Sequence, residues 1–105
     1  MINRKILGML GLASRARKIT FGADSTEQDI LKNKVKLVVV AEDASDRTKN
    51  KFIEISKREN IPIIIFGNIE ELSKTIGKQN KAIIGVKENN IAQEIEKLYR
   101  GDVNG

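Results

Sequence analysis

The feature that most constrains the fold is a pair of short apolar runs at residues 37–41 and 61–66, the first of which follows Lys36 in an expected strand over residues 36–41. Both runs are rich in Val and Ile, and both are bounded by polar segments. Runs of this length and composition are typical of strands that are buried on both faces of a sheet. We therefore expect both runs to be central strands, with helices covering the sheet on either side.

Helical and strand patterns alternate along the whole chain. Apolar residues recur at helical spacing over residues 3–13, 69–76 and 91–99, while residues 18–21 and 82–86 favour further strands. This alternation predicts an α/β fold in the form of a three-layer α/β/α sandwich. With 105 residues there is room for one domain, over residues 1–100, followed by a flexible C-terminal tail over residues 101–105.

A glycine turn precedes the second predicted helix, which should run to about residue 33 and bury Ala23 and Ile30. Gly22 is followed by a polar cluster at residues 24–28. One interpretation is that Asp24 or Ser25 caps the helix, with a capping box completed three residues later. The other is that the free amides of the helix start dock nucleic acid while polar side chains read base edges.

The N-terminal segment is strongly basic. Its first eighteen residues contain five cations and no carboxylate, in a chain of net charge +5. Such a one-sign patch can contact phosphates, and an excess of positive charge favours polyanionic partners. Alternatively, the cations near residues 15–18 are favoured by the negative end of a helix dipole.

Several kinds of chemistry are excluded by composition. The chain has no Cys and no His, so disulfides, the usual zinc ligands and a Ser/His/Asp triad are absent. Glu42 and Asp43 follow a strand and could serve as metal ligands or acid–base groups, but a solvated loop in which Asp43 or Ser45 caps the next helix is the favoured interpretation. We predict no catalytic residues, no metal and no cofactor, and hence no enzyme.

The lack of disulfides fits a reducing compartment, and no apolar run approaches the ~20 residues of a membrane span. We therefore expect a cytoplasmic protein without a membrane partner. Of the four aromatic residues, Phe52, Phe66 and Tyr99 fall on predicted core faces. Binding of RNA would then depend on charge, backbone and polar side chains more than on base stacking.

Several short motifs together resemble the ribosomal protein L-seven-Ae family of kink-turn RNA binders, and most closely its bacterial YlxQ-like branch. In chain order the motifs are Leu10-Gly11-Leu12-Ala13, Arg15-Ala16-Arg17-Lys18, Gly22-Ala23, residues 37–44, Ile61-Pro62, and Leu72 with Ile76-Gly77. The resemblance covers roughly residues 6–100. It implies a four-stranded mixed sheet, no catalysis, and binding of a sharply bent RNA loop with sheared G·A pairs.

The resemblance also indicates which positions contact RNA. Gly22 matches the family glycine, and Lys32 keeps a basic character. Asp24 stands in the place of an Asn, Ser25 in that of a Glu, and Gln28 in that of a Lys. Ser25 is too short to repeat the contact of a Glu with guanine, although Asp24 could partly substitute for it.

Four further positions lie beyond this turn. Ser45 falls where a Glu often lines a pocket for a flipped base, Ile69 replaces a Lys, and Lys78 and Asn80 fall in a contact loop after the fourth helix. We therefore predict a monomeric, non-enzymatic RNA-binding protein of ribosomal type, with structured RNA, including ribosomal RNA, as its partner. The alternative is a protein-interaction adaptor on the translation machinery that keeps the fold without RNA specificity. The predicted RNA surface consists of Arg15, Arg17, Lys18, Gly22, Asp24, Ser25, Gln28, Lys32 and Lys78.

Overall fold

Helices and strands alternate along the chain in the computed structural model, which describes the backbone of residues 3–104 and the side chains of residues 3–101. The elements are, in chain order, α1 (Arg4–Arg15), β1 (Ile19–Phe21), α2 (Ala23–Leu31), β2 (Leu37–Val40), α3 (Asp46–Arg58), β3 (Ile63–Ile65), α4 (Ile69–Thr75), β4 (Ile83–Val86) and α5 (Asn89–Asn104). The predicted alternation is confirmed, with boundaries that move by a few residues.

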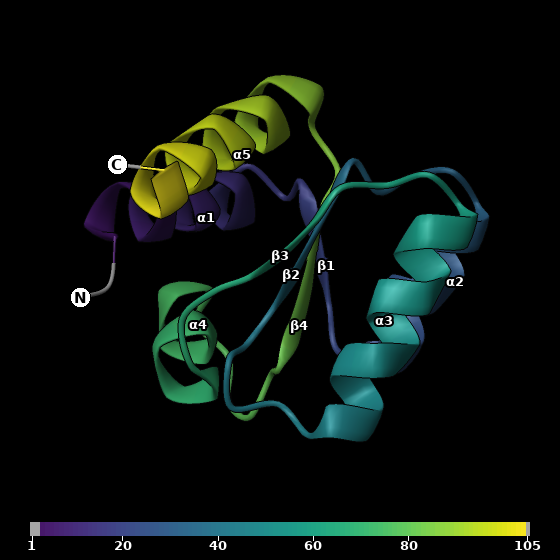
Figure 1. The fold of residues 1–105 in the computed structure, drawn as a ribbon. Helices are drawn as coiled ribbons and strands as arrows, with labels where there is room; N and C mark the ends of the chain where they lie inside the picture. Colours follow the sequence, from purple (N-terminus) through teal and green to yellow (C-terminus); the bar gives the residue numbers. More distant parts are fainter. Residues whose placement is uncertain (1–2, 105) are drawn as a thin grey trace.

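The four strands form one mixed sheet in the order β1-β4-β2-β3. β4 is antiparallel to both of its neighbours, β1 and β2, whereas β2 and β3 are parallel. Helices α2 and α3 cover one face of the sheet, and α1, α4 and α5 cover the other (Figure 1). The predicted three-layer α/β/α sandwich with a four-stranded mixed sheet is therefore confirmed.

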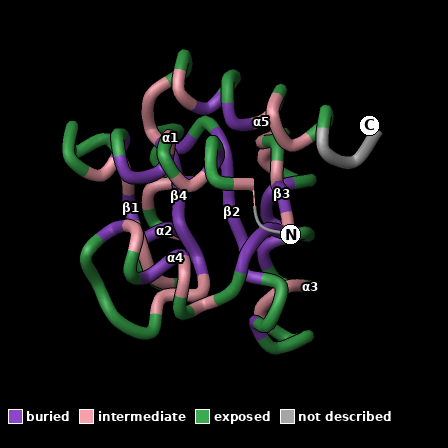
Figure 2. Tube along the Cα trace, turned by 90° about the vertical axis from the view of Figure 1, so that its left-hand side faces the viewer, coloured by how far each residue is buried: buried purple, intermediate pink, exposed green. Residues whose placement is uncertain are grey.

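The prediction that residues 61–66 form a central strand was wrong. β3 lies at the edge of the sheet, and Ile63 and Ile65 are only half-buried. The central strands are β2 and β4, whose residues are all buried (Figure 2). Helices on both faces also shield an edge strand, so its sequence is as apolar as that of a central one. Pro62, just before β3, was the signal for an edge position because it lacks a backbone donor.

The middle of β4 is packed unusually closely against α2. A Cβ placed on Gly85 would lie 2.7 Å from the Cγ2 of Thr20 on β1 and 3.2 Å from that of Thr26 on α2. Thr26 and Ile30 are fully buried on this side of α2, as expected, whereas Ala23 is exposed, contrary to the prediction. Gly85 therefore sets how closely the start of α2 approaches the sheet.

The last helix extends further than the sequence indicated. α5 continues to Asn104, so residues 101–104 prolong the helix where a tail was predicted, and Gly105 lies outside the described residues. No helix in the described part of the chain is both long and apolar enough to cross a membrane.

Candidate nucleic-acid interface

Four connecting segments meet where β1, β2 and β3 end and β4 begins. Because β1 and β2 are both antiparallel to β4, and β2 is parallel to β3, the carboxyl ends of these three strands share one edge of the sheet. Backbone hydrogen bonds join the segments there: Gly22 N–H donates to the carbonyl of Ile83 (2.9 Å), and Glu42 N–H donates to that of Gly67 (2.7 Å). We call this region the carboxyl edge.

The start of α2 lies at the carboxyl edge and has no side-chain cap. Gly22 is the N-cap residue, with φ 85° and ψ 157°, a conformation that a residue with a Cβ rarely adopts. The prediction that Asp24 or Ser25 caps the helix was wrong, because α2 begins at Ala23 and both side chains fall inside its first turn. The first amides of α2 are therefore left for another partner, and the helix ends at Leu31, two residues earlier than predicted.

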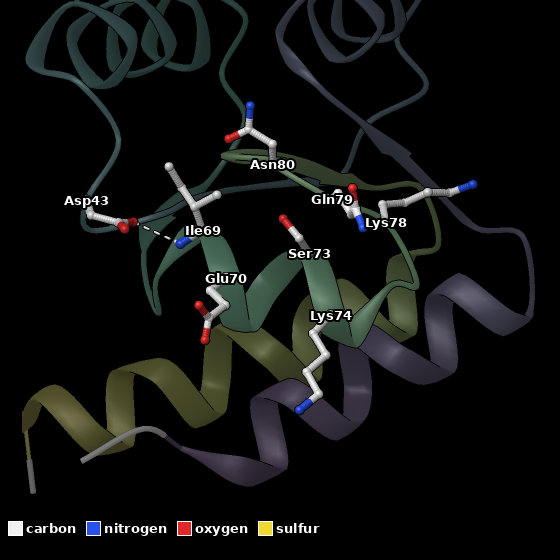
Figure 3. A pocket seen from close by; sticks show the side chains of 8 residues that line it. All are labelled: Asp43, Ile69, Glu70, Ser73, Lys74, Lys78, Gln79 and Asn80. Carbon is white, nitrogen blue, oxygen red and sulfur yellow. Dashed lines mark hydrogen bonds between the residues drawn. The ribbon is translucent and has the colours of Figure 1, made fainter.

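Asp43 and Ser45 have separate structural roles at this edge. Ser45 caps α3, as predicted, by accepting a hydrogen bond from the backbone N–H of Thr48 (3.1 Å). The Oδ1 of Asp43 instead accepts from the backbone N–H of Ile69 (2.8 Å), the first residue of α4 (Figure 3). Within the described residues, no group of three carboxylates is placed to hold a metal ion.

An open pocket of about 630 Å³ lies between the Asp43 loop, α4 and the loop that follows α4. Ile69 and Ser73 contribute from α4, and Asn80 lines the pocket from the loop (Figure 3). The loop is fixed to α4 because the Oγ of Ser73 accepts from the N–H of Lys81 (2.7 Å) and donates to its carbonyl (3.2 Å). The pocket therefore combines an apolar side chain with polar groups, which suits a planar polar ligand such as a nucleobase.

Phe21 joins the glycine turn to this loop. The Nζ of Lys78 lies 5.1 Å from the centre of the Phe21 ring, and the Nζ of Lys81 lies 5.5 Å from it. These are cation–π distances, so the ring holds two cations beside the uncapped start of α2. Lys78 was among the residues predicted to contact RNA, whereas Phe21 and Lys81 were not. The available signal was that Phe21 was the aromatic residue not assigned to a core face.

Ser25 and Gln28 line a second, smaller groove of about 310 Å³ between β1 and α2, together with Phe21. Both polar side chains are exposed, as is Asp24 in the first turn of the helix. Five of the nine residues predicted to contact RNA thus lie near one another, namely Gly22, Asp24, Ser25, Gln28 and Lys78, and their contact with RNA stays a prediction.

Four of the predicted contact residues lie elsewhere. Lys32 is the C-cap of α2, at the opposite end of that helix from Gly22. Arg15, Arg17 and Lys18 precede β1, and the carbonyl of Lys18 accepts from the N–H of Lys87 (2.7 Å), just beyond the last residue of β4. The residues predicted to form a single RNA surface therefore lie in different places. Some lie where β1 ends and α2 begins, and the others lie before the start of β1 or at the end of α2.

The three-layer fold agrees with comparisons to known proteins. The chain matches the model of the ribosomal protein L7Ae/L30e/S12e/Gadd45 family over residues 4–96, and it belongs to that family. It is 35% identical over 98 residues to the RNA-binding protein YlxQ of Enterococcus faecium, with 93% of this chain and 94% of that protein covered. It is 31% identical to the protein of the same name from Bacillus subtilis, with 86% and 90% covered.

Solved structures show the same fold. A protein of unknown function from Bacillus halodurans superposes with a TM-score of 0.88 at 32% identity, with 91% of this chain and 97% of that one covered. The Giardia lamblia 15.5kD RNA binding protein superposes with a TM-score of 0.79 at 16% identity, with 96% and 92% covered. At this low identity the second likeness supports the fold alone.

Proposed function

We propose that this protein is a non-enzymatic RNA-binding protein that recognises structured, kink-turn-like RNA at its carboxyl edge. The two YlxQ relatives carry the name RNA-binding protein, and they match nearly the whole chain. A bent RNA loop exposes phosphates, sugars and unstacked bases at one place, and this edge offers a complementary group for each of them.

The observation that carries the proposal is the uncapped start of α2 beside two lysines. Its free amides and partial positive charge attract a phosphate group. Lys78 and Lys81, held over Phe21, add two cations on the same side. The pocket lined by Ile69, Ser73 and Asn80 is placed to accept an unstacked base next to that phosphate.

Base recognition rests on the polar side chains of α2. Ser25 and Gln28 line the groove beside Phe21, where amide and hydroxyl groups can hydrogen-bond to base edges. The carboxylate of Asp24, also exposed in the first turn, is an acceptor for guanine amino and imino groups. This set departs from the family pattern at three positions, so we expect the preference for kinked RNA to be smaller than in a member with Glu at position 25.

The test is the affinity of the full chain for a kink-turn RNA and for a straight duplex of equal length and base composition, measured by fluorescence anisotropy over a salt series. We expect tighter binding to the kink-turn RNA at every salt concentration. The double variant K78A/K81A should weaken binding and make the salt dependence shallower by about two phosphate contacts. A variant with two distant substitutions, K57A/K97A, is the matched control for net charge. Equal affinity for both RNAs would contradict kink recognition.

The adaptor alternative has a distinct outcome in the same series. If the protein keeps the fold without RNA specificity, neither RNA is bound at low salt, and its association with the translation machinery survives ribonuclease. Binding that is lost on ribonuclease treatment and on substitution of Lys78 would exclude the adaptor and support the carboxyl edge as the site.

A further inference from the structure

The turn between α1 and β1 carries three cations that form no ion pair with the residues that the structure describes. We call residues Arg15–Lys18 the arginine turn. The side chains of Arg15, Arg17 and Lys18 are exposed and form no ion pair with any residue of the described chain. The first carboxylate in the sequence is that of Asp24, beyond β1. The turn is thus a compact patch of positive charge.

Arg17 occupies a backbone position that other residue types fill more easily. Helices α1 to α4 end in the same way. The residue directly after the C-cap has a positive φ, and the N–H of the residue that follows it donates to the carbonyl five positions earlier in the chain. At the ends of α2, α3 and α4 that residue is Asn33, Asn60 and Gly77, which tolerate this conformation. At the end of α1 it is Arg17, with φ 59°. Asn would adopt this left-handed conformation at a lower cost than Arg does. The presence of Arg therefore indicates that its side chain has a role beyond forming the turn.

The side chain of Arg15 is accommodated by a missing Cβ. A Cβ placed on Gly11 would lie 3.3 Å from the Nη1 of Arg15 and 3.8 Å from the Cγ2 of Thr75. Gly11 therefore leaves room for the guanidinium to lie along α1, between that helix and the end of α4. Arg15 therefore lies near Gly11, and the side chains of Arg17 and Lys18 are exposed as well.

The arginine turn is electrostatically separate from the carboxyl edge. Lys18 and Gly22 lie at opposite ends of β1, and four steps along an extended strand place them about 13 Å apart. This exceeds the Debye length of about 8 Å at physiological ionic strength. The turn contains three cations and one alanine, with no aromatic side chain on which a base could stack. Arg and Lys read guanine in an open major groove, but the major groove of an A-form RNA duplex is too deep and narrow for side chains to reach the bases. Its chemistry fits phosphates and carries no sequence information.

We propose that the arginine turn is a second RNA contact, which binds the phosphodiester backbone of a duplex segment flanking the bend and raises affinity without adding to discrimination. This inference rests on the proposed function for the identity of the polyanion. It assigns different roles to the two surfaces: the carboxyl edge distinguishes kinked from straight RNA, and the arginine turn raises the affinity for both RNAs by the same factor.

The test uses the full chain, a kink-turn RNA with extended stems and a straight duplex of equal length, over a salt series. The turn variant is R15Q/R17N/K18Q, where Asn at position 17 preserves the left-handed backbone. The control variant K57Q/R58Q/K97Q removes the same charge from exposed positions on α3 and α5. We expect the turn variant to bind both RNAs about tenfold more weakly or worse, with a salt dependence shallower by two to three phosphate contacts and an unchanged ratio of the two affinities. The control variant should have the wild-type slope, and both variants should remain folded at the assay temperature, as checked by thermal denaturation.

The outcomes separate this inference from the proposed function. The arginine turn is not an independent contact if the turn variant has the wild-type affinity and salt dependence, or if the control variant loses as much of both as the turn variant does. The same conclusion follows if the ratio of affinities for kinked and straight RNA falls together with the salt dependence. If wild type binds both RNAs equally but the turn variant still has the shallower slope, kink recognition fails and the arginine turn stands. Absence of all RNA binding by wild type at low salt overturns both.

Discussion

The two ends of β1 differ in chemistry although only three residues separate them. At its carboxyl end, Gly22 opens α2 without a cap, Phe21 holds Lys78 and Lys81, and a pocket lies alongside. At its amino end, the arginine turn presents cations on an exposed backbone. The carboxyl end combines hydrogen-bond donors and acceptors with an aromatic ring and positive charge. The amino end offers the positive charge of the arginine turn. Discrimination between RNA shapes needs the first set, whereas affinity for any polyanion needs only the second.

The packing of β1 and α2 against β4 positions both ends of β1, and a substitution at Gly85 would disrupt that packing. Gly85→Ala would place a Cβ 2.7 Å from the Cγ2 of Thr20, inside a site where Thr26 and Val35 also approach within 3.2 Å. We expect a loss of about 2–3 kcal/mol in the free energy of unfolding, measured by urea denaturation, because overpacking forces β1 and α2 away from β4.

Gly8 provides the matched control for that substitution. A Cβ at Gly8, on the exposed side of α1, would meet nothing within 4 Å. Gly8→Ala should raise the free energy of unfolding by about 1 kcal/mol, since Ala favours a helix over Gly. If Gly85→Ala is as harmless as Gly8→Ala, the close approach of α2 to the sheet does not position the site.

Ser25→Glu should increase the selectivity of the carboxyl edge for kinked RNA. A carboxylate at position 25 would restore the acceptor that the family pattern places there, and a bidentate contact with guanine contributes on the order of 1–3 kcal/mol of discrimination. We expect the ratio of affinities for kinked and straight RNA to rise tenfold or more, measured by competition between the two RNAs. A uniform loss of affinity for both would mean that position 25 faces phosphate, where added negative charge repels.

Arg17→Asn separates stability from binding at the arginine turn. Asn tolerates positive φ better than Arg, so we expect the free energy of unfolding to rise by about 1 kcal/mol in thermal denaturation. The affinity for RNA should fall in the same variant. Arg17→Lys, which keeps the charge and the strained backbone, serves as the control. A drop in stability on Arg17→Asn would assign Arg17 a structural role in place of the one proposed.

Phe21→Leu has the smallest expected effect. Leu keeps apolar volume beside β1 but removes the ring under Lys78 and Lys81. Exposed cation–π contacts contribute about 0.5–1 kcal/mol, so affinity for kink-turn RNA should fall two- to fivefold with an unchanged salt slope, because both charges remain. The comparison variant is Phe21→Tyr, which keeps a ring for the lysines. A steeper or shallower slope for Phe21→Leu would show that the ring does more than orient the cations.

Much of the fold was predictable because local patterns and layer architecture agree. The spacing of Ile6 and Leu10, and that of Phe52 and Ile55, identified helices whose buried residues are those expected. The position of β3 was not predictable from its apolar residues, since this edge strand is as apolar as a central one although Ile63 and Ile65 are only half-buried. The end of α5 was also missed, because its final turns carry no apolar periodicity that distinguishes a helix from a tail.

The candidate site was only partly predictable, for reasons of topology. Gly22 was identified because a glycine before a polar cluster is a local signal. The meeting of Phe21 with Lys78 and Lys81 depends on β1 pairing with β4, a contact between distant parts of the sequence. The division of the basic residues depends on strand direction, which places Lys18 and Gly22 at opposite ends although they are close in sequence.

The most direct test of the central claim, that RNA docks at the carboxyl edge, is an amide chemical-shift titration of the isotope-labelled full chain with kink-turn RNA. We predict the largest changes at the backbone amides of residues 22–25 and 78–81, with a second, smaller group at residues 15–18 that appears equally with a straight duplex. Changes that are confined to α3 and β3, or that spare the start of α2, would contradict the account.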